Sequence, residues 1–258
     1  MSNQAANRRE QLRRQQEAAA KAKRTQRIVG IVAAVVATVL VGILVFTLVN
    51  AAGNSARGSQ TTPPNATSER TGIRIPPASG QLKEGAPTVE VFFDYQCPYC
   101  RDLETTKGAA FNALAESGEI ALINRTMTFM DNNMRNTASS RAAVAAACSD
   151  EAGVYPEYNA AVFANQAAQE IPGSIGYTDE LLTSTIPQAV GITGEALTRF
   201  QSCVSSNATK DFVDEVDKAA YKAGVTGTPT LHVNGKVVEW RPLPTTPEAL
   251  LAALKAAA

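Results

Sequence analysis

The chain has 258 residues, of which 45% are hydrophobic and 19% are charged; this composition supports one sizeable hydrophobic core and excludes a wholly disordered chain. The formal charge is zero, but residues 1–27 hold eight basic and two acidic residues, so the remainder is acidic and unsuited to binding nucleic acid. A single histidine, His232, and four cysteines argue against multi-histidine metal sites and a disulfide-dense scaffold, and we expect no metal and no cofactor.

Residues 28–49 form an uncharged stretch of 22 residues rich in Ile, Val, Leu and Ala. As a helix this stretch is about 33 Å long, which is enough to cross a bilayer. A cleaved signal peptide is the alternative, with a weak cleavage site at residues 51–53, but the apolar segment of a signal peptide is usually about 7 to 15 residues long. Because the basic residues 1–27 precede the stretch, we expect a single-pass protein of the cell membrane with a cytoplasmic N-terminus and an extracytoplasmic C-terminal part.

Residues 50–87 are rich in Gly, Ser, Thr, Asn and Pro and contain few large apolar side chains. Such a composition is typical of a flexible linker. We therefore expect the linker to connect the membrane helix to one domain, residues 88–258.

The sequence of residues 88–258 predicts a domain of mixed strands and helices. Thr88–Phe93 is a β-branched and aromatic run typical of a buried strand, and Asn234-Gly235 is a strong hairpin signal. The predicted order is a strand at residues 88–93, a helix that follows Cys97 and stops at Ser117-Gly118, a strand at 120–127, a helical block at about 134–224, a hairpin at 231–238, and a last helix capped by Thr246 with Lys255 near its end.

Cys97-Pro98-Tyr99-Cys100 stands where the first predicted strand passes into its helix. Unpaired backbone N–H groups and the helix dipole favour an anion there, so we expect Cys97 to be a nucleophile with a lowered pKa. Cys100 lies one turn later, and we expect it to be the less exposed, resolving cysteine. Pro98 suits the first turn of a helix because its missing N–H would have no helical partner.

Zinc binding and an inert buried pair are the alternatives to redox chemistry at this motif. A zinc site needs further ligands at suitable spacing, and the two other cysteines, Cys148 and Cys203, are isolated in the sequence. In an oxidising compartment we expect these two to form a structural disulfide, with buried free thiols as the alternative. Pairing of either with Cys97 or Cys100 stays open on the sequence alone.

Two motifs give the chain a family resemblance. Phe92–Cys100 reads FFDYQCPYC and Gly227–Thr230 reads GTPT, and through them the sequence resembles the DsbA-like branch of the thioredoxin superfamily over about residues 88–256. The resemblance implies an α/β, thioredoxin-like fold in which the helical block 134–224 is the family's insertion. The CPYC tetrad is also similar to that of glutaredoxins, but those are small cytosolic proteins without an anchor or a large insertion.

The resemblance also implies roles for residues around the cysteine pair. Pro229 would follow a cis peptide bond that faces the pair, and the backbone beside it would pair with a substrate as an added strand. Thr228, Pro98 and Tyr99 would modulate the reactivity of the pair.

One position departs from the family pattern. Related proteins often carry a buried acid for proton transfer six residues before the first cysteine, where this chain has Val91. Glu90 and Asp94 are nearby, but in a regular strand both lie on the opposite face from Val91. Glu90 and Asp94 fit a solvated edge or a helix-entry position at least as well as they fit a role as proton acceptor. The proton acceptor is therefore left unassigned.

Several other side chains have both a structural and a functional interpretation. Methionine sulfurs together with the cysteine pair would suit Cu(I), although core packing is the commoner role of methionine. His232 is expected to be a satisfied sheet residue rather than a ligand or a base. The methionines are Met127, Met130 and Met134. Three aromatic residues either border a shallow groove for unfolded peptide or pack in the scaffold: Tyr95, Tyr99 and Phe129.

These features together predict a membrane-anchored, extracytoplasmic thiol-disulfide oxidoreductase whose Cys97–Cys100 pair oxidises cysteines of exported proteins. Its expected partners are exported proteins with free thiols or disulfides, a membrane redox partner that re-oxidises it, and the bilayer around residues 28–49. A disulfide reductase or isomerase, and a non-catalytic copper- or client-binding module, are the alternatives. The sequence has nothing similar to the dimerisation domain of disulfide isomerases, which favours a monomer.

Overall fold

The structure is a computed structural model that describes residues 38–45 and 59–258. The chain divides into two units, Met1–Ala56 and Arg57–Ala258, and each is described by itself. In the first unit residues 38–45 are helical. Within the described parts of the chain no helix is both long and apolar enough to cross a bilayer, and the basic tail and most of the predicted span 28–49 lie outside them.

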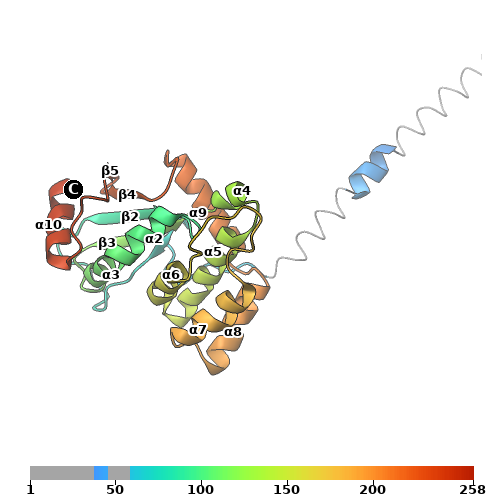
Figure 1. The fold of residues 1–258 in the computed structure, drawn as a ribbon, viewed down its shortest axis with the longest axis horizontal. Coiled ribbons are helices and arrows are strands. Elements are labelled where there is room, and N and C mark those ends of the chain that lie inside the picture. Colours follow the sequence, from blue (N-terminus) through green and yellow to red (C-terminus); the bar gives the residue numbers. More distant parts are fainter. Residues whose placement is uncertain (1–37, 46–58) are drawn as a thin grey trace, which may run out of the picture. The chain divides into compact units, whose positions relative to one another are not determined.

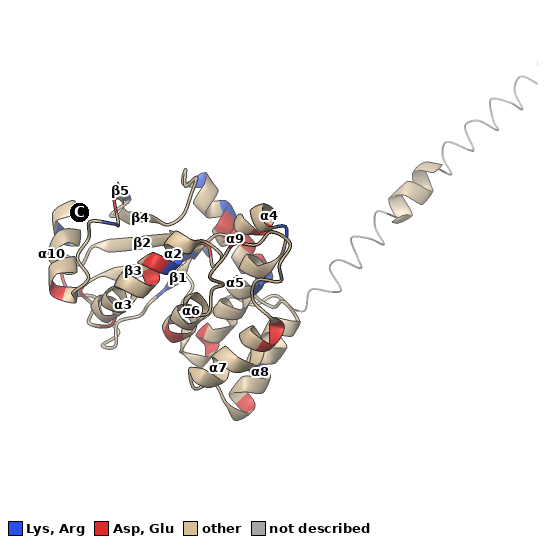
Figure 2. Ribbon diagram, viewed as in Figure 1, with Lys and Arg blue, Asp and Glu red and all other residues tan. Residues whose placement is uncertain are grey.

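Five strands of the second unit form one sheet in the order β1-β3-β2-β4-β5; Figure 1 labels β2 to β5, and Figure 2 also labels β1. The central strands β2 and β3 are parallel, and the other neighbouring pairs are antiparallel. The strands are β1 (Ile73–Arg74), β2 (Thr88–Phe93), β3 (Ala121–Thr126), β4 (Thr230–Val233) and β5 (Lys236–Val238). The β-branched and aromatic side chains of β2 are almost all buried, as expected for a strand covered on both faces.

A helix follows β2 as predicted, in three consecutive segments: α2 (Pro98–Leu103), the π-helical segment η1 (Glu104–Gly108) and α3 (Ala109–Glu116). Pro98 occupies the first turn of α2. The hairpin between β4 and β5 and the last helix, α10 (Pro247–Ala257), are also confirmed. The fold is therefore an α/β, thioredoxin-like arrangement of strand, helix, strand, hairpin and helix.

A helical insertion lies between β3 and β4 and carries acidic residues on several of its helices (Figures 1 and 2). Helix α5 is at its centre, in contact with α6, α8 and α9. The alanines of α5 are almost completely buried, because small side chains let neighbouring helices approach closely. The segments are α4 (Met130–Met134), α5 (Ala138–Ser149), η2 (Asp150–Ala152), α6 (Tyr155–Ala164), η3 (Leu181–Thr185), α7 (Ile186–Ala189), α8 (Gly194–Ser205) and α9 (Lys210–Lys222).

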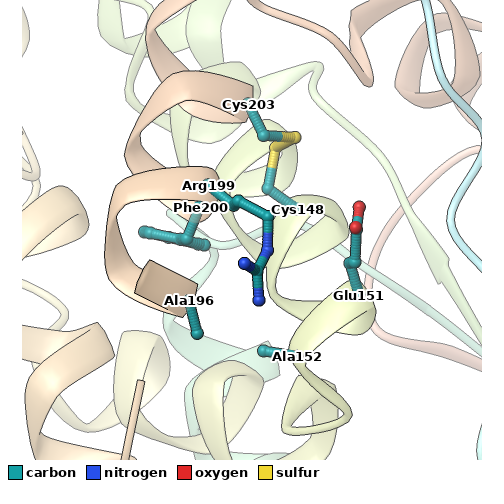
Figure 3. Close-up of a pocket in the computed structure, with 7 residues that line it drawn as sticks. All are labelled: Cys148, Glu151, Ala152, Ala196, Arg199, Phe200 and Cys203. Atoms are coloured by element: carbon teal, nitrogen blue, oxygen red, sulfur yellow. A yellow bond between two sulfur atoms is a disulfide. The ribbon is translucent and has the colours of Figure 1, made fainter. Parts of the chain in front are cut away.

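A disulfide joins α5 to α8 within the insertion. The sulfur atoms of Cys148 and Cys203 are bonded at 2.04 Å and close a loop across 55 residues. Figure 3 shows the disulfide beside a small pocket that Glu151, Arg199 and Phe200 help to line. The bond therefore ties together two helices of the insertion and involves neither Cys97 nor Cys100, which are free thiols.

The expectation of a flexible linker over residues 50–87 is wrong for residues 59–87. Strand β1 pairs with β3, and the side chains of Ile73 and Ile75 are buried in the core. Asn65 is held by Asp150, whose carboxylate accepts bonds from the Asn65 backbone N–H at 2.7 Å and from its side-chain amide at 2.9 Å. A few apolar side chains and one buried acid are enough to anchor a segment whose overall composition is that of a linker.

Candidate active site

The two cysteines of the CPYC motif lie where β2 passes into α2. Cys97 is the N-cap residue of α2, with φ −76° and ψ 120°, so its own backbone is extended while the next residues turn into the helix. Both thiols are buried, but Cys97 is 5% exposed and Cys100 only 1%. A partner thiol therefore reaches the Cys97 sulfur first.

The surroundings of the pair divide it into one acidic and one neutral thiol. The pKa of Cys97 is lowered to about 6, chiefly because the Cys100 thiol donates to its thiolate; burial opposes this, and the Thr228 side chain and the backbone N–H groups of Cys100 and Tyr99 add to it. Burial and the neighbouring Cys97 raise the pKa of Cys100 well above its ordinary value. Near neutral pH the reduced pair thus holds a thiolate at Cys97 and a thiol at Cys100.

A cis peptide bond between Thr228 and Pro229 faces this pair. Strand β4 begins directly after it and pairs antiparallel with β2, which brings the loop to the cysteines. The Cys97 thiol donates to the Thr228 carbonyl oxygen at 3.4 Å. The Thr228 hydroxyl is buried and has no hydrogen-bond partner while Cys97 is a thiol, and a thiolate at Cys97 gives it one.

Removing this hydroxyl tests its effect on the thiolate. We expect Thr228→Val to raise the pKa of Cys97 by about one unit, the scale of one hydrogen bond to a charged group. Ultraviolet titration of the reduced protein measures the change, and Thr228→Ser, which keeps the hydroxyl, should titrate like the unsubstituted chain. A valine variant with an unchanged pKa would show that the hydroxyl does not bind the thiolate.

The aromatic residues near the pair have different environments. Tyr99 is 59% exposed, and the guanidinium of Arg241 lies 5.0 Å from its ring centroid. Tyr95 is completely buried and its hydroxyl donates to Asn159 at 2.8 Å, so of its two interpretations the structure supports packing in the scaffold. Phe129 is partly buried against the core.

Comparison with known proteins agrees with this geometry. The family model described as thioredoxin matches residues 80–256. The chain belongs to the thioredoxin family. No curated protein matches it.

Solved structures add thiol-disulfide oxidoreductases to which this thioredoxin-family chain is similar. The MdbA protein of Corynebacterium diphtheriae, a thiol-disulfide oxidoreductase, has 18% identity and a TM-score of 0.57, with 78% of this chain and 96% of that chain covered; it shows the fold. Reduced DsbG, a disulfide bond oxidoreductase of Mycobacterium tuberculosis, has 25% identity and a TM-score of 0.53, with 71% and 86% covered. Oxidised DsbA of the same organism has 25% identity and a TM-score of 0.55, with 72% and 92% covered. The chain is thus homologous to thiol-disulfide oxidoreductases.

Asp94, for which the sequence leaves open a solvated edge, a helix-entry position and a role as proton acceptor, is completely buried in this thioredoxin-family domain. Strand β2 ends at Phe93, so the strand alternation does not continue to Asp94. Its carboxylate accepts hydrogen bonds from the backbone N–H groups of Gln96 at 2.9 Å and Met130 at 3.0 Å, and from the Ser139 hydroxyl at 2.5 Å. Burial nevertheless outweighs these bonds and raises the pKa of Asp94 to about 7.

This buried acid predicts a pH-dependent stability. The pKa of Asp94 is about 7 in the folded chain and about 3.9 in the unfolded chain. The contribution of protonated Asp94 to the free energy of unfolding is therefore fully present below about pH 4 and is lost as the pH rises through about 7. The loss amounts to at most about 4 kcal/mol. In Asp94→Asn the side chain cannot ionise, so this contribution to the pH slope disappears.

Urea unfolding of the oxidised protein between about pH 5 and pH 8 measures the effect, since Cys97 and Cys100 do not titrate in that form. The mismatched amide of the Asp94→Asn variant shifts its whole curve by a constant. Parallel curves for the two proteins would show that Asp94 does not change its ionisation over this range.

A second carboxyl group with a raised pKa, which the sequence interpretation does not include, belongs to a partly buried residue of the active-site helix. Glu104 is four residues after Cys100 and so lies on the same side of the helix. Desolvation raises its pKa to about 7, and a hydrogen bond from Asn159 opposes the shift. The spacing of four residues from a reactive cysteine is the sequence feature that could have indicated this position. It is easily missed, because a glutamate at this spacing is also common on the solvent-exposed face of a helix.

The other residues considered in the sequence analysis lie in ion pairs or in the hydrophobic core. Glu90 forms an ion pair with Arg125, and His232 Nδ1 lies 3.9 Å from the Glu90 carboxylate. Within the described part of the chain no cluster of three or more His, Cys, Asp or Glu side chains is arranged to hold a metal. The three methionines of the copper alternative, Met127, Met130 and Met134, are buried in the hydrophobic cores.

Proposed function

We propose that the chain is an extracytoplasmic thiol-disulfide oxidoreductase that donates the Cys97–Cys100 disulfide to cysteines of exported proteins. The observation that carries the proposal is the division of the pair into a stabilised thiolate at Cys97, with a pKa of about 6, and a neutral buried thiol at Cys100. Stabilising the Cys97 thiolate stabilises the reduced protein relative to the oxidised one. The disulfide form is then a strong oxidant.

The exchange proceeds in two balanced steps. A client thiolate attacks the Cys97 sulfur of the oxidised pair; the Cys97–Cys100 bond breaks, and the Cys100 sulfur leaves and is protonated because its pKa is high. A second client thiolate then attacks the client sulfur of this mixed disulfide and expels Cys97 as a thiolate. Two electrons pass to the enzyme, and the client gains one disulfide.

The groups around the pair have distinct roles in this proposal. The Thr228 side chain stabilises the departing Cys97 thiolate. The backbone next to the cis bond before Pro229 pairs with the client as an added strand, which holds the client sulfur opposite Cys97. Pro98 starts the helix whose first N–H groups face the sulfur, and the exposed ring of Tyr99 provides apolar contact area beside it.

The N-terminal residues 1–49 have a role in the re-oxidation of the enzyme in this proposal. The reduced enzyme must be re-oxidised, and we assign this step to a membrane redox partner. The stretch 28–49 is the anchor that keeps the domain close to that partner, with the basic residues 1–27 in the cytoplasm.

Mixing the oxidised full chain with a reduced, unfolded client that contains two cysteines tests the proposal. We expect one client disulfide to form for each enzyme disulfide lost, counted by mass spectrometry after the thiols are alkylated. A Cys97→Ser, Cys100→Ser double variant is the control for air oxidation. Clients that stay reduced beside an enzyme that stays oxidised would rule out disulfide donation.

A further inference from the structure

A side chain of the helical insertion holds the segment in front of the active-site helix. Gln166 follows α6, and its backbone N–H donates to the Phe163 carbonyl at 3.1 Å, which fixes its place at the end of that helix. Its side-chain amide donates to the carbonyl oxygens of Tyr95 at 2.7 Å and of Cys97 at 3.0 Å. The Tyr177 hydroxyl donates to the same Tyr95 carbonyl at 2.6 Å. Two residues of the insertion thus bind the turn that ends in Cys97.

The active-site helix binds the insertion in return. The Arg101 guanidinium donates to the backbone carbonyl oxygens of Gln166 at 3.4 Å and Ala167 at 3.3 Å. The amide of Gln166 faces the turn with its nitrogen, and its Oε1 is buried without a hydrogen-bond partner. The amide nitrogen of Gln166 thus satisfies two carbonyl oxygens, and the buried, unpaired Oε1 is the energetic cost of this orientation.

These contacts fix the backbone of Cys97 from both sides. Its N–H donates to the Asp94 carbonyl at 3.0 Å, and its carbonyl accepts from the N–H groups of Cys100 at 3.1 Å and Arg101 at 3.2 Å as well as from Gln166. The direction of the Cα–Cβ bond of Cys97, and with it the position of the sulfur over the first turn of α2, depends on this backbone geometry.

We infer that Gln166 is a positioning residue for Cys97: through it, the helical insertion holds the turn so that the sulfur lies against the first backbone N–H groups of α2. The inference rests on the proposed function in taking Cys97 as the nucleophile. It goes beyond that function because it gives the insertion a part in the reactivity of the cysteine pair, in addition to any part in binding clients.

The pKa of Cys97 in the reduced full chain tests this inference. In Gln166→Ala we expect the ultraviolet titration of the thiolate to move upward from about 6 by about one unit, and the rate of alkylation at pH 6 to fall several-fold. Gln169→Ala is the matched control, because Gln169 is an exposed residue of the same loop and makes no hydrogen bond within the described structure; it should titrate like the unsubstituted chain.

A folded Gln166→Ala variant whose Cys97 pKa equals that of the control would overturn the inference. Gln166→Met, which keeps the length of the side chain and removes the donor, gives the same reading if the alanine variant does not fold. The titration requires no client, so it is separate from the proposed function. An unsubstituted chain that has an acidic Cys97 and oxidises no client would end the proposed function and leave this inference to be decided by the variants.

Discussion

Replacing Cys97 by serine is expected to reduce disulfide transfer to the uncatalysed rate. The serine oxygen cannot take part in a disulfide, and Cys100 alone is buried at 1% exposure with a pKa well above its ordinary value, so no reactive sulfur remains. Stopped-flow measurement of client oxidation or insulin reduction would show the loss.

Replacing Cys100 by serine is expected to have a different effect. Cys97 keeps its reactivity towards client disulfides in this variant, but no second enzyme thiol resolves the product, so the mixed disulfide with the client accumulates and is visible on a non-reducing gel. Stable adducts through Cys100 in the Cys97→Ser variant would reverse the assigned roles.

Removing the disulfide of the insertion should have the largest effect on stability. The bond between Cys148 and Cys203 closes a loop across 55 residues, for which the chain-entropy model gives about 4 kcal/mol, a large part of the roughly 5 to 15 kcal/mol typical of a domain. We expect Cys148→Ala, Cys203→Ala to lower the Tm by about 10 °C.

The folded double variant should keep the acidic Cys97 thiol, because the disulfide lies in the insertion and is separate from the reactive pair. Both single variants are useful controls, since each leaves a free thiol that is able to exchange with the Cys97–Cys100 disulfide. A Tm of the double variant within about 2 °C of the unsubstituted chain would show that the bond does not stabilise the domain.

The local patterns predict the framework of the site well. Thr88–Phe93 and Asn234-Gly235 predict the strand and the hairpin that the structure contains, because β-branched runs and type I′ turn residues act over a few neighbours. The motif at Cys97 likewise depends on a local feature, the strand-to-helix junction.

What the sequence did not predict depends on contacts between distant residues. Asp94 is buried against the insertion, where Ser139 and Met130, which are 45 and 36 residues away, supply two of its three donors. Gln166 lies 69 residues from the Cys97 carbonyl that it binds. Neither contact leaves a periodic pattern in the sequence, and the same holds for the short strand at Ile73, whose composition is typical of a linker.

The equilibrium of the full chain with reduced and oxidised glutathione tests the central claim, that stabilisation of the Cys97 thiolate makes the disulfide form a donor. The account predicts a reduction potential much closer to about −120 mV, the value of a strong oxidant, than to about −270 mV, that of thioredoxin. A measured potential near about −270 mV would contradict disulfide donation and would identify the chain as a reductase.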